Sequence, residues 1–430
     1  MGKRVRFANW ESLIDELLGL VLDKLVYLRD YIRFSAVCKS WNSAASNRRE
    51  KRPWLLISSS DKDNGRRKLS VYNFISDEII KLRIPYKYKI KRCSGSSHGW
   101  LFFVESVSTL VVLNPFSGDI IQLPPLKSVD IINNGLGKVI LSKDPSLGAF
   151  EVLATSSCSH VVAHLKFGDD FWAYSNSIPH TNRPRCLIFY KNIILGASPG
   201  GGILSLQVTS CDDIHSSSSR CIKVEKIIPD LNNNLDLVFS SRYFVLETTE
   251  CDLIMVERYS KFDFKQYSTF KIIVSNGQVL DRTPVVNLGG HSLFLGNSND
   301  SISVLASDYG GCRSNSIYYC HSYTMFKKHL VRRRVLKYGR IEEFNLDNQS
   351  FQYHQEFSMS HEASWIVPSM RTVVRNQLMK YTNSSDSDGK LERIPIADFG
   401  GESLFSGKLS TGISVLASEL SWMYAKCDLL

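Results

Sequence analysis

The chain has 430 residues, of which 43% are hydrophobic and 22% charged, and its mean hydropathy is −0.12. These values are typical of a globular protein with an ordinary hydrophobic core and exclude a disordered chain. No apolar run reaches the roughly 18 residues that a membrane-spanning helix needs. The basic residues 3–6 are not followed by the apolar segment of a secretory leader, so we expect no membrane partner.

The net charge of +10 raises the question of nucleic-acid binding. The positive residues fall in clusters at 48–52, 66–68, 87–92 and 327–334. Neither a nucleic-acid-binding signature nor interleaved aromatic residues accompany them, so we expect solvated loops and no specific nucleic-acid partner. The alternative for 327–334 is a nuclear-import signal. Ten cysteines are scattered without a CxxC pair, which favours a reducing compartment, the nucleus or the cytoplasm.

Residues 10–45 predict two or three short amphipathic helices. Ser12 and Asp15 have the spacing of a capping box for the first helix, and Asp30 is the candidate N-cap of the second. Apolar residues then recur at intervals of three and four on one broad face. These apolar residues are Leu13, Leu17, Leu18, Val21, Leu22, Leu25, Ile32, Phe34, Val37, Cys38 and Trp41.

So small a helical unit carries more large apolar residues than it can bury by itself. One interpretation is that its apolar face docks on a second protein. The other is that the helices cap the domain that follows in their own chain. Periodicity alone leaves both open.

The order of residue types in this segment resembles the F-box, the helical motif that tethers substrate receptors to the Skp1-type adaptor of a cullin-RING ubiquitin ligase. The likeness covers residues 8–48 and is most specific at residues 37–41 (VCKSW). It implies a Skp1-like adaptor as a direct partner and a cullin complex as an indirect one. The adaptor-binding residues that it implies are Leu13, Ile14, Leu17, Leu18, Val21, Leu25, Val37, Cys38 and Trp41. F-boxes usually carry Leu-Pro where Leu13-Ile14 stands, so a preset first-turn φ is missing and weaker adaptor binding is expected.

From Pro53 onward the apolar period changes from four residues to two, which predicts strands. Segments 72–82 and 113–123 match at an offset of 41 residues, and each reads as a strand, a polar turn and a strand. That offset lies in the range of one propeller blade. Further strand-turn-strand units are predicted at 187–208, 243–259 and 340–353. A mainly β fold follows, with a β-propeller of about six blades over residues 53–368, because a sandwich would leave long exposed edges.

Four segments of this β region resemble landmarks of a plant family that joins an F-box to a β-propeller of the kinase-interacting (KIB) type. They are Gly99-Trp100-Leu101, residues 113–118 (LNPFSG), residues 288–296 (LGGHSLFLG) and residues 365–368 (WIVP). The resemblance implies a client protein held by propeller loops, with a kinase as one client class. It also implies a receptor that acts by proximity rather than by acid-base chemistry.

The last part of the chain repeats an earlier part. Residues 391–419 match residues 280–308, and residues 403–405 (SLF) and 413–418 (ISVLAS) are unchanged. The stretch before them is rich in Ser, Asn and Asp. We therefore expect a flexible linker over residues 369–394 and a partial duplicate of the last propeller segment over 395–430.

Three patterns invite a catalytic interpretation, and each has a simpler one. His160 and His164 have the spacing of a helical metal site, but they lie among predicted strands and lack its glutamate. Residues 200–202 (GGG) lack the Lys-Ser/Thr of a P-loop and predict a turn, and residues 169–170 (DD) predict a solvated turn. We expect no catalysis, no cofactor and no metal. The alternative function is a propeller enzyme or ligand sensor whose helices only cap the barrel.

Overall fold

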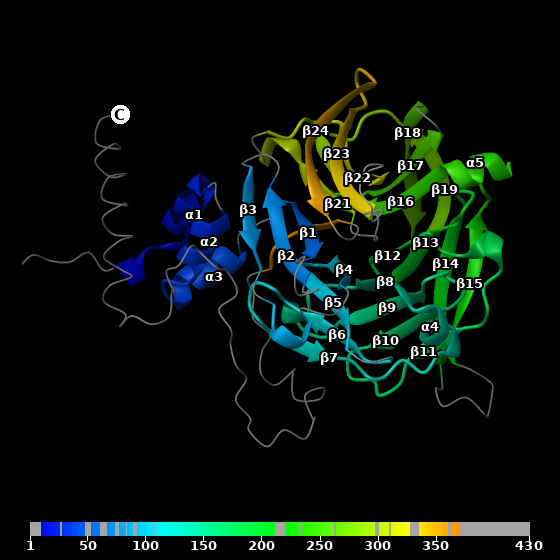
Figure 1. Ribbon diagram of the computed structural model, residues 1–430, viewed down its shortest axis with the longest axis horizontal. Coiled ribbons are helices and arrows are strands. Elements are labelled where there is room, and N and C mark those ends of the chain that lie inside the picture. Colours follow the sequence, from blue (N-terminus) through cyan, green and yellow to red (C-terminus); the bar gives the residue numbers. More distant parts are fainter. Residues whose placement is uncertain are drawn as a thin grey trace, which may run out of the picture.

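The computed structural model describes residues 10–25, 28–47, 53–60, 67–73, 77–82, 84–88, 93–105, 108–210, 220–232, 234–261, 264–296, 301–308, 311–326, 335–359 and 363–369. Over these residues the protein is mainly β, with a small helical unit followed by strands in a propeller-like arrangement (Figure 1). The positive clusters at 48–52 and 327–334, nearly all of the predicted linker and the duplicated tail lie outside the described residues.

The helical unit consists of a 3₁₀ turn, η1 (Trp10–Ser12), and the helices α1 (Asp15–Lys24), α2 (Leu28–Ser35) and α3 (Lys39–Asn47). The predicted capping box is wrong, because Ser12 ends the 3₁₀ turn and the apolar Ile14 occupies the N-cap of α1. The predicted N-cap at Asp30 is also wrong, since α2 begins earlier and Asp30 lies in its first turn. There the carboxylate of Asp30 pairs with Arg33 at 3.4 Å and complements the positive end of the helix dipole.

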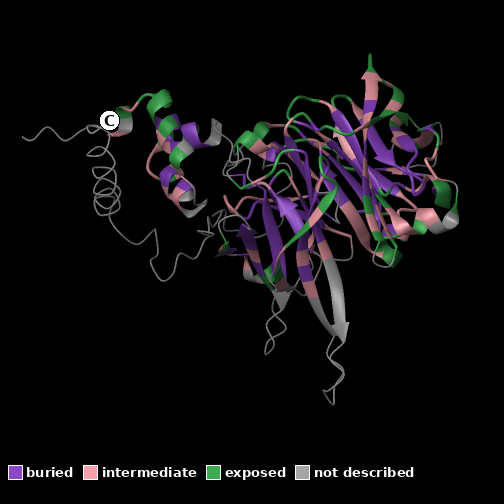
Figure 2. Cartoon of the chain, turned by 90° about the horizontal axis from the view of Figure 1, so that it is seen from above, coloured by how far each residue is buried: buried purple, intermediate pink, exposed green. Residues whose placement is uncertain are grey.

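The three helices enclose a hydrophobic cluster of their own (Figure 2). Its buried members are Leu18, Leu22, Tyr31, Phe34, Trp41, Ala44 and Ala45. The rings of Phe34 and Trp41 lie 4.4 Å apart between centroids, and Trp41 Nε1 donates to the Trp10 carbonyl oxygen at 2.9 Å. Every residue of this cluster comes from residues 10–45, so the helical unit has a core that does not extend into the β region.

The first sheet joins the two ends of the β region. Its order is β25–β1–β2–β3, and every pair is antiparallel. The strands are β1 (Trp54–Ser60), β2 (Arg67–Asn73), β3 (Glu78–Lys81) and β25 (Ser364–Ile366). Leu55 lies opposite Trp365, so the last described strand closes the series of sheets onto the first. The period-two pattern of the sequence did not predict this closure.

Three further sheets have four or five strands. The second sheet contains β4 (Cys93–Ser97), β5 (Trp100–Val104), β6 (Leu110–Leu113) and β7 (Ile120–Gln122), in that order. Another contains β16 (Ser241–Glu247), β17 (Leu253–Lys261), β18 (Phe264–Ser275) and β19 (Gln278–Val285), also in order. The last has the order β21–β20–β22–β23–β24, with β20 (His291–Leu295), β21 (Ile302–Leu305), β22 (Ser316–Phe326), β23 (Val335–Asn345) and β24 (Ser350–Met359).

The remaining sheet has eight strands in the order β12–β13–β14–β15–β11–β10–β9–β8. They are β8 (Leu136–Leu141), β9 (Glu151–Ser156), β10 (Val162–Lys166), β11 (Ala173–Ser175), β12 (Cys186–Tyr190), β13 (Ile193–Ala197), β14 (Ile203–Ser210) and β15 (Arg220–Ile228). Its two antiparallel halves meet at the parallel pair β11–β15. The described residues therefore form five hydrogen-bonded sheets, which do not confirm the predicted count of six blades.

Short helices connect the strands. They are η2 (Tyr86–Tyr88), α4 (Val129–Asn134), η3 (Pro145–Leu147), η4 (His180–Asn182), α5 (Leu235–Ser240) and η5 (Ala306–Asp308).

The predicted hairpins are confirmed. Tyr72 lies opposite Ile79 in β2–β3, and Leu113 lies opposite Ile120 in β6–β7. These hairpins are the third and fourth strands of consecutive sheets, so the offset of 41 residues spans one sheet. The units predicted at 187–208, 243–259 and 340–353 form β12–β14, β16–β17 and β23–β24.

The hydrophobic core lies between the faces of neighbouring sheets. One cluster joins Trp100 and Phe102 of β5 to Val139 of β8 and Val152 of β9, and all four side chains are buried. Such interleaving explains why strands such as β6 (LVVL) are apolar at every position, because both of their faces are covered.

Candidate protein-binding surfaces

Helix α1 presents apolar side chains that its own bundle does not cover. Ile14 and Leu20 are each 60% exposed and Leu17 is 40% exposed. They recur every three residues, and residues at that spacing are neighbours on one side of a helix. Exposed apolar residues grouped in this way are typical of a surface that a second protein covers.

The other residues predicted to bind an adaptor fall into two groups. Half-buried side chains pack against the bundle core while keeping one side accessible; these are Leu13, Val21, Leu25, Val37 and Cys38. Leu18 and Trp41 are fully buried in that core, so they hold the helices together rather than offering a contact surface. Sequence reasoning missed Leu20, although its three-residue spacing from Leu17 was a usable signal.

Three of the family-like segments meet where the β region ends. Trp100 Nε1 donates to Asp144 Oδ1 at 3.0 Å, and the Ser369 hydroxyl donates to Asp144 Oδ2 at 2.6 Å. Asn114 Nδ2 donates to the Ser369 carbonyl oxygen at 3.0 Å. Gly99 has φ +86°, and a Cβ there would lie 2.6 Å from the Val367 carbonyl oxygen. We call Trp100, Asn114, Asp144 and Ser369 the closure latch.

The carboxylate of Asp144 is the centre of this latch. Burial alone would raise the pKa of Asp144, but hydrogen bonds from Ser146, Ser369 and Trp100 hold it below its ordinary value. Asp144 is therefore ionised at neutral pH and accepts all of these bonds as a charged group, which makes them stronger than neutral ones. The role of Asp144 is therefore structural. Its hydrogen bonds link the end of the propeller to the second sheet and to the loop before β9.

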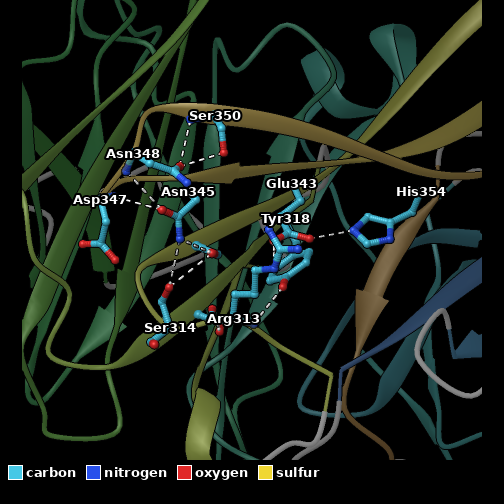
Figure 3. Close-up of polar contacts among 11 residues, drawn as sticks. Arg313, Ser314, Tyr318, Glu343, Asn345, Asp347, Asn348, Ser350 and His354 are labelled. Atoms are coloured by element: carbon cyan, nitrogen blue, oxygen red, sulfur yellow. Dashed lines mark hydrogen bonds and ion pairs between the residues drawn. The ribbon is translucent and has the colours of Figure 1, made fainter.

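A second polar cluster surrounds the β23–β24 turn (Figure 3). Asn345 Oδ1 accepts from the Asp347 and Asn348 amides at 3.1 and 3.2 Å, which shapes the turn. Farther along the sheet, the buried Glu343 bonds to His354 Nε2 at 2.8 Å, and Arg313 Nε lies 3.5 Å from its other oxygen.

The nearby Cys312 brings no nucleophile to this cluster. Burial, reinforced by the charge of Glu343, raises the pKa of the Cys312 thiol to about 12. The thiol is therefore protonated at neutral pH and is not a nucleophile.

The catalytic patterns considered in the sequence take structural positions. His164 lies in β10 and bonds to Glu151 at 2.8 Å, whereas His160 lies in the preceding turn, 3.7 Å from Asp130. Gly201 has φ +84° in the β13–β14 turn, as predicted for residues 200–202. Asp169 pairs with Arg220. Across the described ranges, no three His, Cys, Asp or Glu side chains are grouped to hold a metal ion.

None of the helices within the described residues has the length and apolar character needed to span a bilayer.

Comparison with known proteins agrees with this division into a helical unit and a β region. The F-box domain model matches residues 10–53, and the KIB1-4 beta-propeller model matches residues 71–345, more than half of the chain. An Arabidopsis thaliana F-box protein, At4g22660, is 22% identical over 415 residues and covers 86% of this chain and 99% of its own length. Another, At2g05970, is 24% identical over 342 residues, covering 75% and 87% respectively.

Among solved structures, a Lactobacillus plantarum protein aligns with a TM-score of 0.40 and 8% identity over 73% of this chain and 98% of its own. That likeness is too distant to bear on function. The two domain matches, in the order in which the structure places a closed helical unit and a ring of sheets, show the family: this chain is a plant F-box protein with a β-propeller of the KIB1-4 type.

Proposed function

We propose that this protein is the substrate-receptor subunit of a Skp1–cullin–F-box ubiquitin ligase. Its helical unit binds a Skp1-like adaptor, and its propeller binds the client protein that is to be ubiquitylated. The observation that carries this proposal is the state of α1: the bundle has completed its own core, yet Ile14, Leu17 and Leu20 stay exposed. Covering one such side chain contributes on the order of 1.5–3 kcal/mol.

The adaptor surface in this proposal differs from the one drawn from the sequence alone. Ile14, Leu17 and Leu20 form its centre, and the half-buried Leu13, Val21, Leu25, Val37 and Cys38 form its border. Leu18 and Trp41 are buried below this surface and hold the helices that form it in place. The protein contributes no catalytic group; it brings client and ligase together and so raises their effective concentration. A kinase is the client class that the KIB likeness favours.

Co-purification with a Skp1-like adaptor tests the first half of the proposal. Leu17→Asp places a charge where an apolar contact is required, so recovery of adaptor from co-expressing cells should fall at least about tenfold. Leu147→Asp is the matched control, because Leu147 is also an exposed leucine but lies on η3 between β8 and β9. Equal recovery of adaptor with wild-type protein and Leu17→Asp would reject adaptor binding by α1.

We also propose that the eight-stranded sheet is two propeller blades, β8–β11 and β12–β15, whose outermost strands pair in parallel. Each half is a four-stranded antiparallel unit like the sheets β4–β7 and β16–β19. Counted in this way the propeller has six blades, and the loops of six blades are available to a client. An experimental structure of the propeller would test the count directly.

A further inference from the structure

The packing between β16–β18 and β22–β24 changes from apolar to charged along the strands. In its apolar part Phe244 packs on Tyr319 at 5.9 Å and Tyr267 stacks on Phe344 at 5.0 Å between ring centroids. Toward the β17–β18 hairpin, Arg258 and Glu342 take the place of apolar residues, and both are buried. Charges buried between sheets cost desolvation energy that apolar side chains would not. Stability alone therefore gives no account of them.

Glu342 is surrounded by more positive charge than it can neutralise. It accepts from Tyr267 Oη at 2.8 Å and Arg258 Nη2 at 3.3 Å, and it also pairs with Lys265 Nζ. Burial alone would raise the pKa of Glu342, but Arg258, Lys265 and the Tyr267 hydrogen bond lower it. One ionised carboxylate is thus shared between two cations.

Further cations border this group at the surface. Arg242 is exposed, and its Nη1 donates to Tyr319 Oη at 3.1 Å. The guanidinium of Arg340 lies 5.3 Å from the centre of the exposed Tyr353 ring, and Arg340 also pairs with Glu356. Burial, together with the charge of Arg258, lowers the pKa of His321 to about 4, so this ring stays neutral at pH 7.

Cations outnumber carboxylates among these named groups. Arg258 and Lys265 share the single carboxylate of Glu342, Arg340 pairs with Glu356, and the exposed Arg242 lies beside them against Tyr319. An aromatic ring belongs to the same surface: Lys265 Nζ lies 5.1 Å from the centre of the Tyr353 ring, which is itself exposed. We call Arg242, Lys265, Arg340 and Tyr353 the basic seam.

We propose that the basic seam binds an acidic peptide segment of the client protein. The inference rests on the proposed substrate-receptor function and names the surface and the chemistry of the client. Arginine guanidinium groups beside aromatic rings suit carboxylate or phosphate groups on a chain that also has apolar side chains. A duplex nucleic acid is a poorer fit, because its affinity grows from many phosphate contacts, whereas the basic seam contains only three cations.

Fluorescence anisotropy with the full-length protein bound to its adaptor tests the seam. The probe is a fluorescein-labelled polyglutamate peptide that carries two tyrosines, and a polyserine peptide with the same tyrosines is the blank. We expect the double variant Arg242→Gln/Arg340→Gln to weaken binding of the acidic peptide by about tenfold or more. The matched control is Lys191→Gln with Lys223→Gln, which removes the same charge from exposed lysines on β12–β13 and β15.

Phosphoserine in place of glutamate in the same peptide separates the two sources of negative charge, and preference for either one supports the seam. Equal weakening by the control pair, or duplex DNA of matched charge binding as tightly and losing affinity in the same seam variants, would overturn the proposal. Adaptor recovery is scored in the same preparations. A seam variant that loses peptide binding but still recovers the adaptor therefore tests the seam alone. Recovery of the adaptor with Leu17→Asp tests the proposed ligase function separately.

Discussion

At the scale of single residues, buried polar side chains in this propeller are explained by the partners they hold. Asp144 is buried, yet it accepts hydrogen bonds from Trp100, Ser146 and Ser369, which come from three separate parts of the chain. A group of this kind ties sequence-distant segments together with a directionality that apolar contacts lack. Its removal leaves several donors without an acceptor, and each such donor is costly when buried.

Asp144→Asn should lower the free energy of unfolding of the propeller by about 2 kcal/mol, because the amide cannot accept all of these bonds. The folded-state pKa of Asp144 is lowered below its ordinary value of 3.8, so its contribution is fully present above that pH and is lost as the pH falls through the lowered value. Urea denaturation should therefore show a constant difference in the free energy of unfolding between wild-type and variant near neutral pH. This difference should become smaller below pH 3.8.

Asp170→Asn serves as the control for that series, because Asp170 is exposed. If the difference in free energy of unfolding between wild-type and Asp144→Asn stays the same down to strongly acid pH, the effect does not come from an ionised Asp144.

At the scale of elements, α1 and the closing segment show where pattern reasoning succeeds and fails. Four-residue periodicity predicted α1, but it could not say which leucines face inward: Leu18 is buried and Leu17 and Leu20 are not. The answer depends on where α2 and α3 pack. The capping box failed for a related reason, since η1 takes up Ser12 before α1 starts. Hairpins were predicted well because their turn residues are local signals.

The end of the propeller is a second prediction at this scale. Ser369 falls in the linker predicted from the sequence, yet it is buried and bonded to Asn114 and Asp144. A chain that stops after Pro368 should therefore unfold at a lower urea concentration than one that stops after Thr372, by a difference of about 1–3 kcal/mol. Denaturation of the two truncated proteins, with full-length protein as reference, makes the measurement. Equal midpoints would show that the Ser369 contacts contribute nothing.

At the scale of the whole molecule, the helical unit and the propeller have separate hydrophobic cores over the described residues. The helical cluster contains residues 10–45 only, and the propeller clusters lie between sheets. A substitution that destabilises one core should therefore leave the other folded, because the two sets of clusters have no side chain in common.

Trp365→Ala tests that independence. Trp365 is buried in β25, where its Nε1 donates to the Leu295 carbonyl oxygen at 3.0 Å and its ring packs on Phe294 at 4.9 Å between centroids. Its loss should cost the propeller about 3–5 kcal/mol, while recovery of the Skp1-like adaptor stays at the wild-type level. Phe239→Ala, at an exposed phenylalanine of α5, is the control. Parallel loss of adaptor would show that the two cores are coupled.

Ring closure was the part of the fold that the sequence could not predict. The pairing of β1 with β25 joins segments from opposite ends of the β region, and no local pattern encodes a contact over such a separation. The blade-like repeat could be read from residues 72–82 and 113–123 because both copies carry the same turn residues. Which strand completes the first sheet became apparent only in three dimensions.

That pairing also sets an order of events during synthesis. The α1–α3 bundle can close as soon as residues 10–47 leave the ribosome, but β1, which pairs early with β2, must wait for its second partner β25 near residue 366. At bacterial-to-eukaryotic translation speeds the wait is roughly 15–60 s. During that time the nascent chain already carries a finished helical unit, so under the proposed function it meets the adaptor before its propeller is able to hold a client.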